Sequence, residues 1–251
     1  MDIERLLALY DAEVRAHPQA QPGMAIERVG GVVRITGPFN FVSAWDLTTE
    51  TARGAVTEQA AHFRSRGEGL LWRVHDHDKP PELSRHLAEE GFMPNETGTV
   101  MMFDLTSPLG AAIGDGVEVR PVRTVDELDG FVSAADRAFG EEESWRRQAY
   151  TARLSDPDLG LYVAYVAGEP AASARLEMSP AWSFGLLQGG GVAPEHRRRG
   201  LYRALVAARA EQARARGLKY LVTDARETSR PILQNLGFSP ATRGTLWVLS
   251  P

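Results

Sequence analysis

The chain of 251 residues contains no cysteine. Disulfides, thiolate nucleophiles and cysteine-based metal sites are therefore excluded. It also has no apolar run that approaches the length of a membrane span. The first residues, Met1-Asp2-Ile3-Glu4-Arg5, lack the basic-then-apolar order of a signal peptide. We therefore expect a cytoplasmic protein with no membrane partner.

An excess of positive charge is absent as well. The formal net charge is −5, so nucleic acid is not the expected partner. Hydrophobic residues make up 43% of the chain, which is typical of a globular protein with one large or two small domains. The sequence leaves open whether the protein is a monomer or a homodimer.

Periodicity predicts an α/β protein with a mixed sheet, divided by a linker at residues 106–116 whose composition is rich in glycine and small residues. We expect one unit over residues 1–108 and another over 117–251. Helices are predicted at 2–17, 47–66, 81–90, 124–139, 144–154, 201–216 and 230–236. Strands are predicted at 32–35, 70–74, 99–105, 117–122, 161–166, 171–178, 184–192, 220–224 and 245–249.

One order of elements occurs twice. A strand at 70–74 is followed by an acid, a helix that begins with proline, Gly91-Phe92 and another strand. The strand at 220–224 is followed by the same features and by Gly237-Phe238. We interpret the repetition as a duplicated unit.

The segment from Val192 to Leu205 is the most informative in the chain. A glycine-rich apolar strand enters it, and an amphipathic helix leaves it from Leu201. The turn between them contains three arginines and ends at Gly200. Backbone N–H groups at the start of a helix attract anions, and a glycine allows close approach. The segment therefore predicts a site for a phosphate-rich ligand.

This segment resembles motif A of the GCN5-related N-acetyltransferases, the GNAT family, whose signature is Arg/Gln-x-x-Gly-x-Gly/Ala after Val-x-Pro. Val192-Ala193-Pro194, Arg197 and Gly200 match it, whereas Tyr202 stands where the family has Gly or Ala. The resemblance implies a GNAT fold in two tandem units, of which the first lacks a basic turn and is degenerate. It also implies acetyl-CoA as the cosubstrate. The expected cofactor-binding residues are Gly191, Val192, Ala193, Arg197, Arg198, Arg199, Gly200, Leu201, Tyr202, Arg203, Ser229 and Asn235.

The resemblance further implies transfer of an acetyl group to an amine of a small molecule or peptide. The alternative is a coenzyme A-binding or regulatory module with impaired catalysis, because Leu233 replaces the tyrosine that usually protonates the thiolate, and Arg226 replaces a customary asparagine. Tyr202 is a candidate replacement donor, although the sequence favours protonation by solvent. Candidate general bases are Glu177, Asp224 and the acids at 141–143.

The run His75-Asp76-His77-Asp78 contains side chains of metal-ligand type. No further ligands follow at a recognisable spacing, and the run lies where a strand meets a proline-rich turn. We therefore expect a solvated turn and no metal site.

Overall fold

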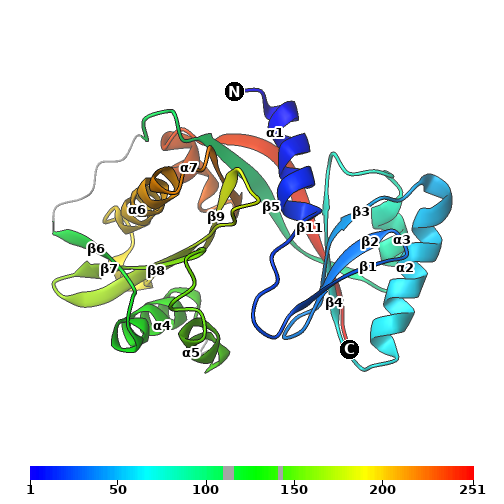
Figure 1. The fold of residues 1–251 in the computed structure, drawn as a ribbon, viewed down its shortest axis with the longest axis horizontal. Coiled ribbons are helices and arrows are strands. Elements are labelled where there is room, and N and C mark those ends of the chain that lie inside the picture. The colour runs from blue at the N-terminus through cyan, green and yellow to red at the C-terminus, as the bar shows by residue number, and fades with distance from the viewer. Residues whose placement is uncertain (110–115, 141–143) are drawn as a thin grey trace. The chain divides into compact units, whose positions relative to one another are not determined.

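The computed structural model describes residues 1–109, 116–140 and 144–251. They form two compact units, shown as ribbons in Figure 1. The first contains Met1–Val100, Ala225–Glu227 and Pro240–Pro251, and the second contains Met101–Asp224 and Thr228–Ser239. Each unit is therefore assembled from separate stretches of the sequence. The linker predicted at 106–116 falls largely outside the described residues, so the boundary between 108 and 117 stays a prediction.

The first unit contains helix α1 (Ile3–Tyr10), which continues as a π-helical turn (Asp11–Arg15), and a mixed sheet. The strand order in this unit is β1-β2-β3-β4-β11. Strands β3 and β4 are parallel, and the other neighbours are antiparallel. The strands are β1 (Ala25–Val29), β2 (Val32–Thr36), β3 (Phe41–Trp45), β4 (Leu70–His75) and β11 (Ser239–Leu249).

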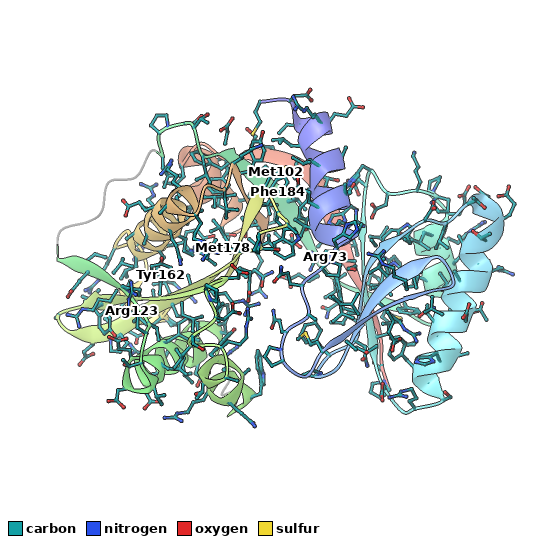
Figure 2. All side chains as sticks on the ribbon, viewed as in Figure 1. Arg73, Met102, Arg123, Tyr162, Met178 and Phe184 are labelled. Atoms are coloured by element: carbon teal, nitrogen blue, oxygen red, sulfur yellow. The ribbon has the colours of Figure 1, made fainter. Side chains whose placement is uncertain are left out.

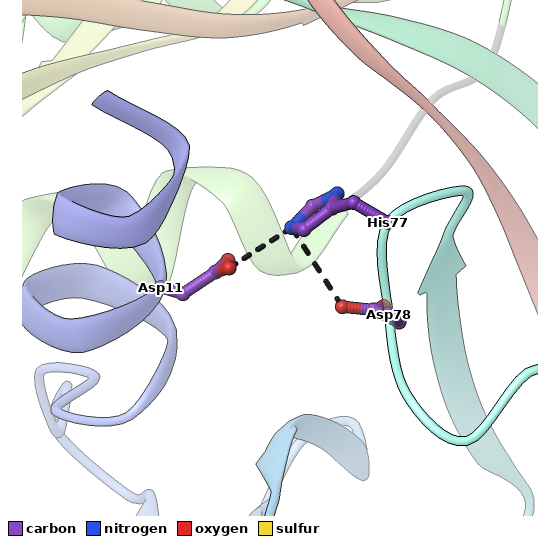
Figure 3. Close-up of side chains that lie close together, drawn as sticks. All are labelled: Asp11, His77 and Asp78. Atoms are coloured by element: carbon purple, nitrogen blue, oxygen red, sulfur yellow. Dashed lines mark hydrogen bonds and ion pairs between the residues drawn. The ribbon is translucent and has the colours of Figure 1, made fainter. Parts of the chain in front are cut away.

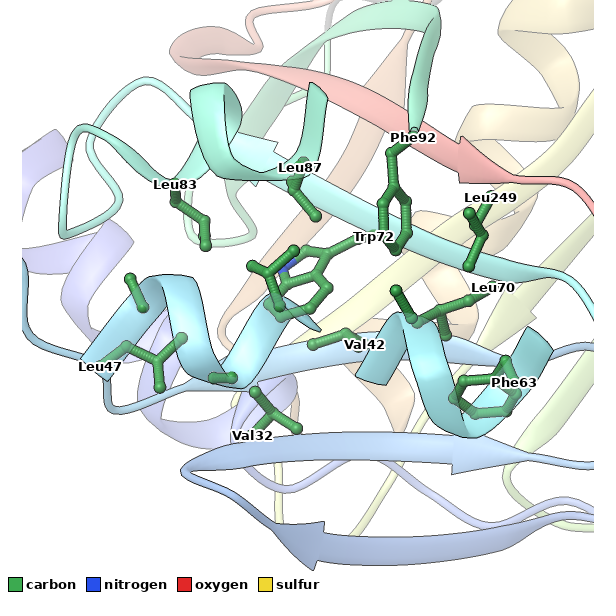
Figure 4. Close-up of a cluster of buried hydrophobic side chains, with 14 residues drawn as sticks. Val32, Val42, Leu47, Phe63, Leu70, Trp72, Leu83, Leu87, Phe92 and Leu249 are labelled. Carbon is green, nitrogen blue, oxygen red and sulfur yellow. The ribbon is translucent and has the colours of Figure 1, made fainter. Parts of the chain in front are cut away.

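Helices α2 (Thr49–Arg64) and α3 (Leu83–Glu89) supply apolar faces to the core of the first unit. A capping box starts α2, because Thr48 and Thr51 bond to one another's backbone N–H groups. Trp72 of β4 is fully buried in a cluster that includes Phe63 of α2 and Leu249 of β11, as Figure 4 shows. The last strand of the chain thus completes the core of its first unit.

The second unit has the strand order β10-β9-β8-β7-β6. Strands β9 and β10 are parallel, and the others are antiparallel. Its strands are β6 (Val117–Pro121), β7 (Leu159–Val166), β8 (Glu169–Glu177), β9 (Phe184–Val192) and β10 (Tyr220–Ala225). Strand β5 (Met93–Asp104) is shared, with its residues up to Val100 in the first unit and the rest in the second.

Helices cover both faces of this second sheet. Leu161 and Val163 of β7 pack with residues of α4 (Val125–Phe139) and α5 (Ser144–Thr151). The alternate residues Tyr162 and Ala164 pack with α6 (Leu201–Ala215). The unit is completed by a 3₁₀ turn at Pro194–His196 and by α7 (Arg230–Asn235). Its buried side chains include Met102, Met178 and Phe184, which Figure 2 labels.

The predicted mixed α/β class is confirmed, and so is the duplicated order of elements, β4-α3-β5 and β10-α7-β11. Strands β1 and β3 were not predicted, and β5 and β11 begin about six residues before the predicted strands. Residues of β1 are mostly half-buried or exposed, so no apolar alternation marks them. Among the described residues, no helix combines the length and apolarity needed to cross a membrane.

Candidate functional site

Strand β9 carries a bulge at its glycines. Ser173 of β8 pairs with Gly191, and Arg175 pairs with Gln188, so Gly189 and Gly190 together oppose one residue of β8. Gly189 has a φ of +56°, which is the left-handed region that glycine adopts without strain. The bulge therefore changes the direction of β9 at its C-terminal end.

Beside the bulge, β9 separates from β10. The parallel ladder joins Phe184–Leu186 to Tyr220–Val222, and beyond it the Thr223 hydroxyl donates to the Leu187 carbonyl at 2.8 Å. Ala193 N–H donates to Ala171 O of the β8 side at 2.9 Å. Because bonded and non-bonded pairs alternate in an antiparallel ladder, Gly191 also bonds to β8, whereas the backbone groups of Val192 face away from it.

The expected cofactor-binding residues of β9 and the turn after it therefore differ in which backbone groups lack a partner. Val192 turns its N–H away from β8, and its carbonyl accepts from Arg197 Nε at 3.4 Å. The Ala193 carbonyl accepts from His196 N–H at 2.9 Å, so both backbone groups of Ala193 have partners. Val192 is thus the residue of the expected three whose N–H points toward the separation between β9 and β10.

The basic turn leads directly into α6. Arg198 and Gly200 have φ values of +63° and +81°, so the backbone alternates into the left-handed region before the helix begins. Gly200 is the N-cap and has no side chain to cap the helix. The N–H groups of Leu201, Tyr202 and Arg203 have no acceptor within the helix, because a first helical turn leaves them unpaired.

The side chains of Arg197, Arg198 and Arg199 are exposed around this turn, and Arg203 is half-buried. The acid of the turn, Glu195, is engaged by Arg137 of α4, with its carboxylate 3.1 Å from Arg137 Nε. Positive side chains and free N–H groups therefore surround the N-terminus of a helix of 15 residues. Such an arrangement attracts anions.

Two glycines of β9 are required by neighbouring side chains. A Cβ on Gly191 would lie 2.7 Å from Ala138 Cβ and 2.9 Å from Phe139 Cζ, so the end of α4 packs directly on the strand. A Cβ on Gly190 would lie 3.0 Å from Tyr202 Cε2. Gly190 thus accommodates the ring that stands at the position of the family's Gly or Ala.

Tyr202 is held at both ends. Its ring lies over Gly190, and its hydroxyl is hydrogen-bonded to Ser229, the residue before α7. Burial raises the pKa of Tyr202, which keeps the hydroxyl protonated at neutral pH. Leu233, at the position of the family's tyrosine, is fully buried, and Asn235 is exposed. The structure thus brings Tyr202 and Ser229 together and leaves Asn235 outside that contact.

The candidate bases lie in different surroundings. Glu177 on β8 is buried and bonded to Arg153 at 3.1 and 2.8 Å, with Arg175 Nε 3.5 Å away. Both oxygens of the Glu177 carboxylate thus already accept hydrogen bonds from Arg153. Asp224 is exposed on β10. The acids at 141–143 lie outside the described residues.

Arg226, which stands at the position of the family's customary asparagine, forms an ion pair with Glu96.

The histidine run of the first unit is an ion network, not the solvated turn expected from the sequence. His75 is buried, and Asp78 is almost fully covered. Figure 3 shows His77 between Asp11 and Asp78, with its Nε2 2.9 Å from Asp11 Oδ2. Arg15 Nη1 lies 2.7 Å from a carboxylate oxygen of each aspartate.

The positive charge of Arg15 balances the negative charge of the aspartates in this network. The Arg15 guanidinium and the backbone N–H of His75, which donates at 2.7 Å, engage both Asp78 oxygens. Burial raises the pKa of Asp78, but the hydrogen bonds with the side chains of His75 and Arg15 outweigh it and hold that pKa below its ordinary value. The three side chains Asp11, His77 and Asp78 have the spacing of metal ligands. A cation would have to displace the buried Arg15, so the residues present do not favour a metal.

Comparison with known proteins supports the fold and the family. The model of the acetyltransferase (GNAT) family matches residues 126–238. A GCN5-related N-acetyltransferase from Kribbella flavida is 16% identical, with a TM-score of 0.74 over 98% of this chain and 95% of that one. One from Sphaerobacter thermophilus is 15% identical, with a TM-score of 0.66 over 98% and 91%.

A tandem GNAT protein from the clavulanic acid biosynthesis pathway is 16% identical, with a TM-score of 0.66 over 94% of this chain and 86% of that one. A search of curated proteins gave no match. At these identities the solved structures support the fold alone. The similarity to the family itself rests on the match at residues 126–238. Residues 126–238 thus match the GNAT acetyltransferase family, and the chain has the fold of tandem GNAT proteins over most of its length.

Proposed function

We propose that the protein transfers an acetyl group from acetyl-CoA to an amine of a small molecule or peptide. The observation that carries this proposal is the anion site at the start of α6, where the glycine N-cap, free N–H groups and exposed arginines meet. The pyrophosphate of the cofactor binds there. Arg197–Arg199 and Arg203 supply the counter-charge, and the N–H groups of Leu201, Tyr202 and Arg203 donate.

The rest of the cofactor lies along the C-terminal end of β9. The Val192 N–H faces away from β8 at this point and donates to the pantetheine arm, which fills the separation from β10. A thioester carbonyl held by a backbone N–H is polarised toward attack. The amine therefore approaches β9 beside Gly191, close to the end of α4.

The departing thiolate of coenzyme A needs a proton. Tyr202 supplies it in this proposal, because its pKa is raised, its ring is fixed over Gly190 and its hydroxyl is oriented by Ser229. The same role falls to a residue of α7 in the family's usual pattern, at the position of Leu233. No carboxylate is assigned as a base, since Glu177 is already paired with Arg153. Water carries the amine proton to solvent.

A second function is favoured by two observations. Leu233 stands at the usual acid position, and Glu177 is neutralised by arginines. Both fit a coenzyme A-binding or regulatory module that has lost catalysis.

Affinity and turnover separate the two functions. The full chain is titrated with acetyl-CoA by calorimetry and then assayed for thiol release with a panel of primary amines and peptides. Binding together with turnover of at least one amine supports the transferase. Binding without turnover of any acceptor supports the binding module, and absence of binding contradicts both.

A further inference from the structure

A buried arginine lies beneath the bulge of β9. Arg209 on α6 is 1% exposed, and within the described part of the chain its electrostatic interactions are with two tyrosines and no carboxylate. Its Nε donates to Leu205 O at 2.9 Å, and its Nη1 donates to Arg175 O at 3.1 Å. Its Nη2 is buried and has no hydrogen-bond partner. Burial lowers the pKa of Arg209 to about 10.

The ionisable groups that face Arg209 carry no compensating charge. They are Tyr162 of β7, labelled in Figure 2, and Tyr202 of α6. Burial raises the pKa of Tyr162 to about 12 and also raises that of Tyr202, so both are neutral at neutral pH. The Tyr162 hydroxyl donates to Gln212 Oε1 at 2.7 Å. Arg209 is therefore a buried cation surrounded by neutral groups.

The contacts of Arg209 lie at the interruption of the β8–β9 ladder. Arg175, whose carbonyl accepts from Nη1, is the first β8 residue back in register after the bulge. A Cβ on Gly190 would lie 3.6 Å from Nη2, on the same side as the Tyr202 ring. The guanidinium thus bonds to one carbonyl beside the bulge, and its Nη2 lies on the side of Gly190 toward which a Cβ would point.

Stability of the fold does not account for this side chain. A buried charge without a partner costs free energy, and an apolar side chain of similar length is often neutral or stabilising in its place. Methionine has that length and adapts to irregular gaps. The contribution that methionine would lose is the hydrogen bond to the Arg175 carbonyl beside the bulge.

We propose that Arg209 is a positioning residue for acyl-CoA, which holds the Gly189–Gly190 bulge in the shape that turns the Val192 N–H toward the pantetheine arm. The proposal rests on the function proposed above. Arg209 lies at the bulge, which faces the pantetheine arm, and not at the N-terminal turn of α6, which faces the pyrophosphate. A change at Arg209 is therefore expected to affect binding of the pantetheine arm and not of the pyrophosphate.

The test compares two ligands on the full chain. Acetyl-CoA contains both parts, whereas 3′-phospho-ADP contains the pyrophosphate without the pantetheine arm. In Arg209→Met we expect acetyl-CoA affinity to fall about tenfold or more, while 3′-phospho-ADP affinity changes by less than about twofold. The Tm of the free variant should equal or exceed that of the wild type.

Three results overturn the proposal: unchanged acetyl-CoA affinity, equal losses for both ligands, or a loss matched by the control Val206→Ala. That control makes a cavity in the same helix and keeps the Arg209 bonds. If Arg209→Met fails to fold, Arg209→Lys is measured by the same comparison. It keeps the charge but cannot make all the bonds of a guanidinium, so the same selective loss is expected. A wild type that binds neither ligand contradicts the proposed function itself.

Discussion

Gly200 combines two properties that the anion site needs. Its φ of +81° ends the basic turn, and its lack of a side chain leaves the first N–H groups of α6 uncovered. Arg198 also has a positive φ, but its side chain is exposed on the turn. We therefore expect the two residues to contribute very differently to the proposed phosphate site.

We expect Gly200→Asp to lower acetyl-CoA affinity by at least about tenfold, because the carboxylate lies where the pyrophosphate must approach. Arg198→Ala should lower it by only about twofold to fivefold, since a solvated charge contributes little. Gly200→Asn is the matched control, because asparagine tolerates a positive φ and carries no charge. Calorimetry measures all three. Equal affinities of the aspartate variant and the wild type would remove the basis of the pyrophosphate assignment.

Tyr202→Phe isolates the hydroxyl from the ring. The ring still fills the space over Gly190, so acetyl-CoA affinity should stay close to that of the wild type. Turnover should fall about a hundredfold, which is the usual contribution of a positioned proton donor. Thiol release at saturating acetyl-CoA is the measurement. Unchanged turnover would mean that solvent protonates the thiolate and that Tyr202 only packs.

At the scale of elements, the bulge of β9 and the close approach of α4 shape the site. The triple glycine at 189–191 serves both, since Gly189 takes up the bulge conformation and Gly191 admits the end of α4. Successive glycines in a strand are compatible both with close approach of a ligand and with close packing of a neighbouring element. The packing distances show that Gly190 and Gly191 fulfil the second, whatever binds beside them.

Gly191→Ala should destabilise the protein by about 1–3 kcal/mol, because the new methyl group would overlap Ala138 and Phe139. Gly54→Ala is the control. Gly54 lies in α2 with no heavy atom within 4 Å of an added Cβ, so alanine there should be neutral or stabilising. Urea denaturation compares both variants with the wild type. A Gly191→Ala protein as stable as the wild type would show that α4 can move away from β9.

The elements that the sequence predicted well are those with strong local signals. The capping box at Thr124 and Glu127 marks the start of α4, and the left-handed Gly217 follows the end of α6. The strands β1 and β3 lack such signals. β1 mixes polar and apolar residues, and β3 is a largely apolar run of only five residues, which is too short to show a period. The turn and helix of the anion site were predicted because the motif is local.

The parts of the site that depend on distant residues could not be predicted. Nothing local to Tyr202 indicates that Ser229 bonds to it, and nothing near Glu177 indicates that Arg153 neutralises it. The same holds for the buried Asp78, whose ion-pair partner Arg15 comes from the start of the chain. Contacts between side chains far apart in the sequence arise only once the fold is formed.

At the scale of the whole molecule, the predicted linker does not separate the core residues of the two units. Leu249 joins the core around Trp72 in the first unit. Met101, Met102 and Phe103 are fully buried in the second, where Phe103 stacks on Phe238 with 5.0 Å between ring centroids. A cut at the predicted linker would therefore remove core residues from both units.

We expect fragments 1–108 and 117–251 to lack cooperative unfolding when separate, because each loses fully buried side chains that contribute about 1.5–3 kcal/mol apiece. Mixing the two fragments should restore a cooperative transition and acetyl-CoA binding. Circular dichroism melts and calorimetry follow both. The expectation fails if fragment 117–251 alone melts like the full chain and binds acetyl-CoA with the same affinity.

The central claim is that the strand, basic turn and helix of the second unit bind acyl-CoA and that the first unit has no such site. Calorimetric titration of the full chain with acetyl-CoA tests it most directly, because it measures affinity and stoichiometry together. The account predicts saturable binding of one acetyl-CoA per chain. Absence of binding, or saturation at two per chain, would contradict it.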